Sequence, residues 1–76
     1  MSDGELPYPK WQIPCVDAVR EFDIGRLPER IRAAETAIQA RLLELETSPD
    51  GAHERLAIND AMKTLHSIKK ERLKLA

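Results

Sequence analysis

The sequence has little of what small proteins use to hold a fold together. It is 76 residues long and has one cysteine, so an intramolecular disulfide is excluded. Its few cysteine and histidine residues do not have the spacing of a structural zinc site. No apolar run approaches the roughly 18 residues that a membrane span needs. A chain below about 80 residues without such supports often relies on oligomerisation.

An excess of charge of one sign is also missing. The chain has 12 basic and 13 acidic residues, for a net charge of -1. Hydrophobic residues make up 42% of the sequence, so its composition is not that of a disordered protein. Met1 to Glu5 has no basic segment and no apolar segment follows it, so we expect no signal peptide. A cytoplasmic location is the expectation.

Two segments with helical periodicity make up most of the chain. We predict helices over about 28–47 and 49–75, each with a proline in its first turn. The link from Ser48 to Gly51 is so short that the two helices must be antiparallel neighbours. The second helix carries the a/d spacing of a short coiled coil. The predicted fold class is all-α, with residues 14–76 forming an antiparallel helical hairpin domain led by a short helix.

An apolar stripe follows each predicted helix, and a hairpin alone covers both stripes poorly. The expected interaction stripe consists of Ile31, Ile38, Leu42, Leu45, Ile58, Met62, Leu65 and Ile68. The stripe could be covered in two ways. In one, the segment from Trp11 to Phe22 packs across it in a three-helix monomer. In the other, two hairpins pair as a four-helix bundle. The homodimer is favoured because the second stripe extends to Leu75, beyond the reach of a short helix.

The N-terminal residues differ in composition from the rest. Pro7, Pro9 and Pro14 disfavour regular helix, so residues 1–13 are predicted to form an extended arm. A short helix is predicted over about 14–22, with Val16, Val19 and Phe22 at three-residue spacing. The expected anchors, which dock this part of the chain on its own hairpin or on another protein, are Tyr8, Trp11 and Phe22.

Residues for catalysis are scarce. Cys15 falls in the first turn predicted after Pro14, where a helix dipole can lower the pKa of a thiol. His53 and His66 are distant in sequence and do not complete a cysteine–histidine arrangement. The expected role of Cys15 is that of a small buried apolar residue. We therefore expect no enzyme, and no catalytic, cofactor or metal site.

Positive charge gathers late in the sequence. The candidate basic patch consists of Lys63, Lys69, Lys70, Arg72 and Lys74. The helix dipole alone favours cations at a helix C-terminus, so nucleic acid is disfavoured as a partner. The expected function is a non-enzymatic protein–protein interaction module, a small helical adaptor, scaffold or inhibitor that uses its stripe or its arm. Its partner would be another protein or a second copy, with no membrane. The alternative is a small nucleic-acid-associated regulator that uses the basic patch.

Overall fold

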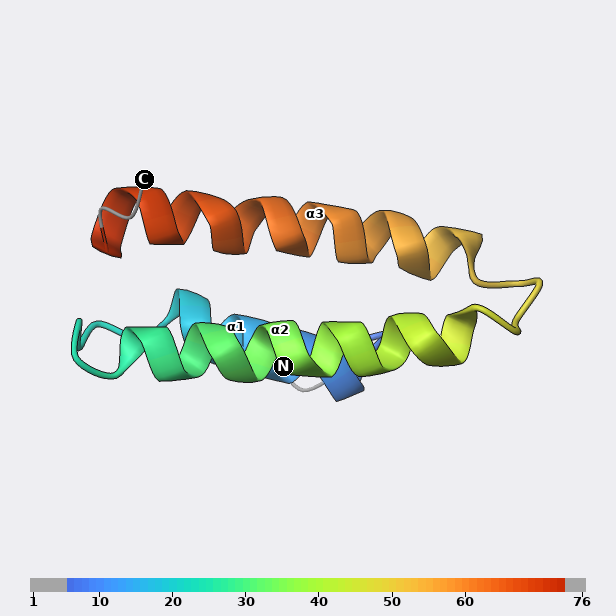
Figure 1. Cartoon of the computed structure of the whole chain (residues 1–76), viewed down its shortest axis with the longest axis horizontal. Helices are drawn as coiled ribbons and strands as arrows, with labels where there is room; N and C mark the ends of the chain where they lie inside the picture. The colour runs from blue at the N-terminus through green and yellow to red at the C-terminus, as the bar shows by residue number, and fades with distance from the viewer. Residues whose placement is uncertain (1–5, 74–76) are drawn as a thin grey trace.

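The computed structural model describes residues 6–73 and is all-helical over that range, as the sequence predicts (Figure 1). Helix α1 spans Pro9–Val19, α2 spans Leu27–Leu45 and α3 spans Ala52–Ile68. A π-helical turn, η1, continues α3 over Lys69–Leu73. Among these residues no helix combines the length and the apolar character needed to cross a membrane.

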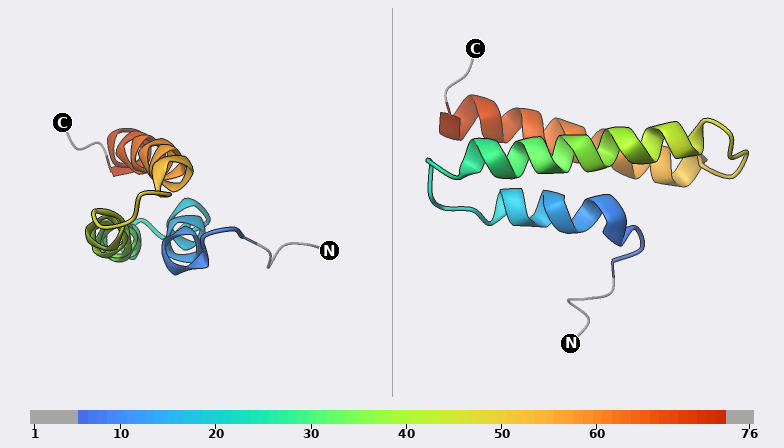
Figure 2. Two further views of the ribbon diagram at one scale, coloured as in Figure 1. Left: turned by 90° about the vertical axis from the view of Figure 1, so that its right-hand side faces the viewer. Right: turned by 60° about the horizontal axis from the view of Figure 1, so that its bottom comes forward.

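The three helices pack around one core. Helices α2 and α3 run in opposite directions, and α1 runs beside them in the same direction as α3 (Figures 1 and 2). Helix α1 lies closer to α2 than α3 does. Between them the helices bury Trp11, Cys15, Ala18, Leu27, Ile31, Ala34, Ile38, Leu45, Ile58, Leu65 and Ile68. A segment that was expected to be partly an extended arm and partly a short helix therefore supplies the third side of the core.

Most of the predicted interaction stripe belongs to this core. Ile31, Ile38, Leu45, Ile58, Leu65 and Ile68 are buried within the single chain. Leu42 is partly buried against the same cluster, and only Met62, at 44%, is well exposed. The stripe is therefore not a free surface on this chain, because α1 covers it. Any interaction surface of this chain therefore lies mostly outside the predicted stripe.

Helix α1 differs most from its prediction. The sequence predicts an extended arm to residue 13 and a helix over 14–22, whereas α1 begins at Pro9 and ends at Val19. Pro9 lies in the first turn, where its missing N–H costs nothing, and the side chain of Gln12 accepts the N–H of Tyr8 at 2.8 Å. Pro14 lies inside the helix and removes one backbone hydrogen bond there. The helix nevertheless continues through Pro14 to Val19, and it buries Trp11 in the core.

The face of α1 that is buried also differs from the prediction. Trp11, Cys15 and Ala18, at steps of four and three residues, face the core. Val16 and Val19 are 36% and 40% exposed, and Phe22 lies beyond the end of the helix and is 87% exposed. These three residues do not fill the core in the way that the three-helix alternative describes. Of the side chains that this alternative places across the stripe, Trp11, Val16, Val19 and Phe22, only Trp11 is buried.

The turn between α2 and α3 is longer than the prediction. Helix α3 begins at Ala52, with Gly51 as its N-cap, rather than at Pro49. Gly51 is buried against Leu45, and a Cβ at this position would lie 3.0 Å from Leu45 Cδ2. The glycine thus lets the chain pass close to the end of α2 before α3 starts. The predicted extension of the second stripe to Leu75 lies outside the described residues.

Candidate interaction groove

A buried carboxylate ties the three helices together at one end of the bundle. Glu54, in the first turn of α3, is 6% exposed. Its Oε2 accepts hydrogen bonds from Trp11 Nε1 of α1 at 3.0 Å and from Arg41 Nε of α2 at 2.7 Å. Its Oε1 accepts a third bond from Arg41 at 2.9 Å. The hydrogen bonds from Arg41 hold the pKa of Glu54 below its ordinary value, although burial opposes the shift.

This cluster has the character of a structural clamp rather than of a catalytic site. Arg41 also donates to Glu44 at 2.7 Å, and Lys10 Nζ lies 3.8 Å from the same carboxylate. Among the described residues, no buried side-chain nitrogen or oxygen lacks a hydrogen-bond partner. A carboxylate whose oxygens are already bonded to a guanidinium and an indole is poorly suited to take a proton from a substrate. We therefore assign a role in the stability of the fold to this cluster of Trp11, Arg41 and Glu54, and we call it the clamp.

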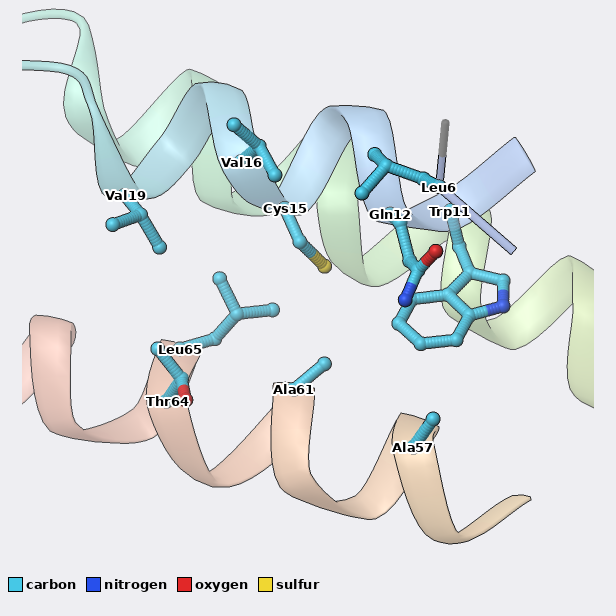
Figure 3. Close-up of a pocket in the computed structure, with 10 residues that line it drawn as sticks. All are labelled: Leu6, Trp11, Gln12, Cys15, Val16, Val19, Ala57, Ala61, Thr64 and Leu65. Carbon is cyan, nitrogen blue, oxygen red and sulfur yellow. The ribbon is translucent and has the colours of Figure 1, made fainter. Parts of the chain in front are cut away.

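An apolar groove runs between α1 and α3 (Figure 3). It has a volume of about 270 Å³ and no charged side chain in its lining. The lining residues are Leu6, Trp11, Gln12, Cys15 and Val16, with Val19 at the end of α1 and Ala57, Ala61, Thr64 and Leu65 on α3. Ala57, Ala61 and Thr64 leave the space open because their side chains are too short to fill the gap between the helices.

The long axis of the groove follows the two helices. In Figure 3, Ala57 lies across from Trp11 and Gln12, and Ala61 lies across from Cys15. Leu65 lies at the Val19 end. The groove is therefore an elongated slot between two helices that run in the same direction.

A ridge of exposed apolar side chains runs beside the groove on α1. We call it the α1 ridge, and it consists of Ile13, Val16 and Val19 on α1, followed by Phe22 in the loop after the helix. Ile13 is 50% exposed, and Phe22 is more exposed still. Both ends of the ridge are therefore more exposed than Val16 and Val19 between them. Ile24, in the loop beyond Phe22, is also exposed. Val16 and Val19 also line the groove, and exposed apolar side chains next to an apolar groove mark a contact site more often than isolated ones do.

Cys15 lies at the bottom of the groove, in the middle of α1 rather than in its first turn. Burial raises the pKa of its thiol, so the neutral form is favoured. His53 and His66 are exposed on α3. Within residues 6–73, no three metal-ligating side chains come together. The thiol thus has neither a base nor the low pKa of a nucleophile.

The candidate basic patch is only partly assembled. Lys69 forms an ion pair with Glu35 of α2. Arg72 donates a hydrogen bond to the carbonyl oxygen of Glu21 at 3.0 Å. Lys63 and Lys70 are exposed, and Lys74 lies outside the described residues. Of the four cations of the patch that lie within residues 6–73, two are thus engaged by their own chain.

The three expected anchors do not act together. Tyr8 and Trp11 stack with ring centroids 5.9 Å apart and an interplanar angle of 12°, and they hold the start of α1 to the bundle. Phe22 lies beyond the other end of α1 and is largely exposed. The sequence prediction assigned no role at a site to Glu54, Arg41 or the small residues of α3 that line the groove.

Comparison of the chain with protein-family models, with curated proteins and with solved structures finds no match. A fold by itself does not specify a function. The function is therefore inferred from the shape and chemistry of the groove and of the α1 ridge.

Proposed function

We propose that this protein is a non-enzymatic protein-interaction module that binds an amphipathic helix in the groove between α1 and α3. The observation that carries the proposal is the groove itself, an open apolar slot flanked by the exposed α1 ridge. It takes the place of the core stripe as the binding surface, because the stripe is covered by α1.

The dimensions of the groove favour a helix over a small molecule. Small-molecule sites are usually enclosed cavities of about 300–1,000 Å³ that surround most of the ligand. The groove here is smaller, at about 270 Å³, and lies open along two helices. A helix laid in such a slot would add a fourth member to the bundle, with its apolar side chains between α1 and α3.

The chemistry of the lining supports a binding role. The groove offers an apolar surface with few polar groups, among them Gln12, the Cys15 thiol and the Thr64 hydroxyl. Burial holds that thiol in its neutral form. None of these groups is paired with a base that would activate it, so the lining is suited to contact rather than to catalysis.

The nucleic-acid alternative has less support. A surface that binds phosphates needs several cations free to neutralise them. Lys69 is paired with Glu35, and Arg72 is bonded to the backbone of the α1–α2 loop. The two exposed lysines of the described patch lie near acidic residues, Lys63 three residues after Asp60 on α3 and Lys70 next to Glu71 in η1.

A photo-crosslinking experiment in the native source tests the proposal. A benzophenone amino acid is placed at Val16, on the edge of the groove, and in a matched variant at Leu43, which is 67% exposed on α2. We expect the Val16 variant to form a covalent protein adduct on irradiation and the Leu43 variant to form none. Absence of an adduct at Val16, or equal adducts at both positions, would overturn the groove as the binding surface.

A further inference from the structure

We propose that the groove accepts its partner helix in one direction only, antiparallel to α1 and α3. Gln12 sets this direction by donating a hydrogen bond to a carbonyl oxygen at the C-terminal end of that helix. The occupant is therefore the C-terminal part of an amphipathic helix of another protein. This inference rests on the proposed function, because it names the orientation and a specificity-determining contact of the same groove.

The side-chain amide of Gln12 is held so that its donor faces the groove. The Tyr8 N–H donates to Gln12 Oε1 at 2.8 Å, and since an N–H bonds only to an acceptor, this contact fixes which end of the amide is the oxygen. The nitrogen, Nε2, is then directed toward α3 and into the groove, opposite the small side chain of Ala57 (Figure 3). Among residues 6–73 this nitrogen forms no hydrogen bond. The lining thus offers a positioned donor to an occupant of the groove.

The end of the groove at Gln12 is also the positive end of two helices. Trp11 of α1 bonds to Glu54 of α3 at 3.0 Å, so the first turns of the two helices lie side by side. The free N–H groups of each first turn give a partial positive charge. The first turn of α1 contains no acidic residue, and Glu54 in the first turn of α3 is already bonded to Arg41. The C-terminal end of a helix carries a partial negative charge and carbonyl oxygens without a partner, so it is the end that fits here.

The fold already contains such a contact on the α2 side of the α1–α3 pair. Helix α2 runs antiparallel to both helices, and none of its residues lines the groove (Figures 1 and 2). Arg55, at the start of α3, donates from its side chain to the carbonyl oxygen of Leu45, the last residue of α2, at 2.8 Å. Gln12 can bind a last carbonyl oxygen of the occupant in the same way. An occupant with the direction of α2 completes a four-helix bundle in which every neighbour is antiparallel.

The order of photo-crosslinks along the partner tests the direction. A benzophenone amino acid is placed at Leu6 in one variant and at Val19 in another, because these residues line opposite ends of the groove (Figure 3). Each full-length variant is irradiated in an extract of the native source, and the adducts are mapped by peptide mass spectrometry. We expect the Leu6 adduct to lie C-terminal, along the partner helix, to the Val19 adduct. The reverse order would overturn the inference.

A carboxylate placed at either end of the groove tests the contact with Gln12. Gln12→Glu keeps an acceptor for the Tyr8 N–H but replaces the donor that faces the groove with an oxygen. The adduct yield from Val16 should fall about fivefold or more, because one hydrogen bond is lost and a negative charge meets the negative end of a helix. Thr64→Glu is the matched control, since it adds the same charge at the Val19 end, where the N-terminal side of the occupant lies.

The Thr64→Glu variant should give a yield equal to or above that of the unchanged chain, and circular dichroism checks that both variants are folded. An equal loss in the two variants would overturn the inference, because it would show that any carboxylate disrupts the apolar groove. An unchanged yield in Gln12→Glu would overturn it as well.

The failure of this inference can be distinguished from failure of the proposed function. If Val16 captures a protein and the capture is indifferent to Gln12→Glu, the orientation is refuted and the groove remains the binding surface. If neither Val16 nor the two end positions form an adduct, both proposals fail. Adducts in the expected order support both, also where the captured protein is a second copy of this chain.

Discussion

Replacement of Trp11 separates two contributions to the stability of the bundle. The indole is 1% exposed and fills the space among the three helices, and its N–H bonds to Glu54 at 3.0 Å. Trp11→Phe keeps most of the buried ring and removes the hydrogen bond. Trp11→Ala removes both. The two variants therefore measure the hydrogen bond and the packing in turn.

The expected loss of unfolding free energy in each variant follows from the burial of Trp11 and from the hydrogen bonds that Glu54 keeps. Truncation of a buried aromatic residue to alanine typically costs about 3–5 kcal/mol, and this site has the near-complete burial to which that range applies. A hydrogen bond to a charged group is typically worth about 1.5–3 kcal/mol. In Trp11→Phe, Glu54 keeps both bonds from Arg41, so we expect about 1–2 kcal/mol, below the full range.

The free energy of unfolding, measured by urea titration with far-ultraviolet circular dichroism, gives the result. A domain of this size has a total stability of about 4–11 kcal/mol at ~0.05–0.15 kcal/mol per residue. We therefore expect Trp11→Ala to be largely unfolded or close to it, and Trp11→Phe to stay folded with a lower midpoint. A Trp11→Ala variant that unfolds within about 1 kcal/mol of the wild type would show that α1 does not close the core.

Three further predictions concern the clamp, the proline inside α1 and the thiol. The pKa of Glu54 is lowered in the folded chain, so its contribution is present above the unfolded pKa of about 4.3 and is lost as the pH falls through the lower folded value. Glu54→Gln should accordingly make stability depend less steeply on pH in acid, as measured by urea titration over that range; an unchanged slope would contradict the assignment. Pro14→Ala should raise the free energy of unfolding by up to about 3 kcal/mol because it restores an N–H inside α1, and a lower stability would show that the proline ring is needed for packing. Cys15 should resist alkylation at neutral pH in the folded protein and react in urea, since burial raises the pKa of its thiol, and fast labelling without urea would contradict the burial.

The sequence predicts α2 and the buried face of α3 well. Leu27, Ile31, Ala34, Ile38 and Leu45 recur at helical steps, and all five are buried. This pattern is strong because each helix is long enough to repeat it several times. The all-α fold follows from it directly.

Helix α1 was mispredicted because two apolar patterns compete in the same segment. Val16, Val19 and Phe22 lie on one side of Pro14 and form a visible series. The true core series of Trp11, Cys15 and Ala18 crosses Pro14, so a boundary placed at the proline divides it. The choice between the series depends on how α1 meets α2 and α3, which is tertiary information.

The clamp has a signal in the sequence, which is a charged residue at a core-facing position of each of the two helices α2 and α3. Arg41 interrupts the stripe of α2, and Glu54 lies four residues before Ile58 on the buried face of α3. Two opposite charges at core-facing positions of neighbouring helices can pair, as Arg41 and Glu54 do here. The groove has no comparable signal, because small residues such as Ala57 and Ala61 become a slot only when α1 leaves them uncovered.

Photo-crosslinking from Val16 tests most directly the claim that the groove between α1 and α3 binds a polypeptide. The expected product is a covalent adduct with another polypeptide, formed from Val16 and absent from the Leu43 control. An irradiated Val16 variant that remains a single chain without any adduct would contradict the claim.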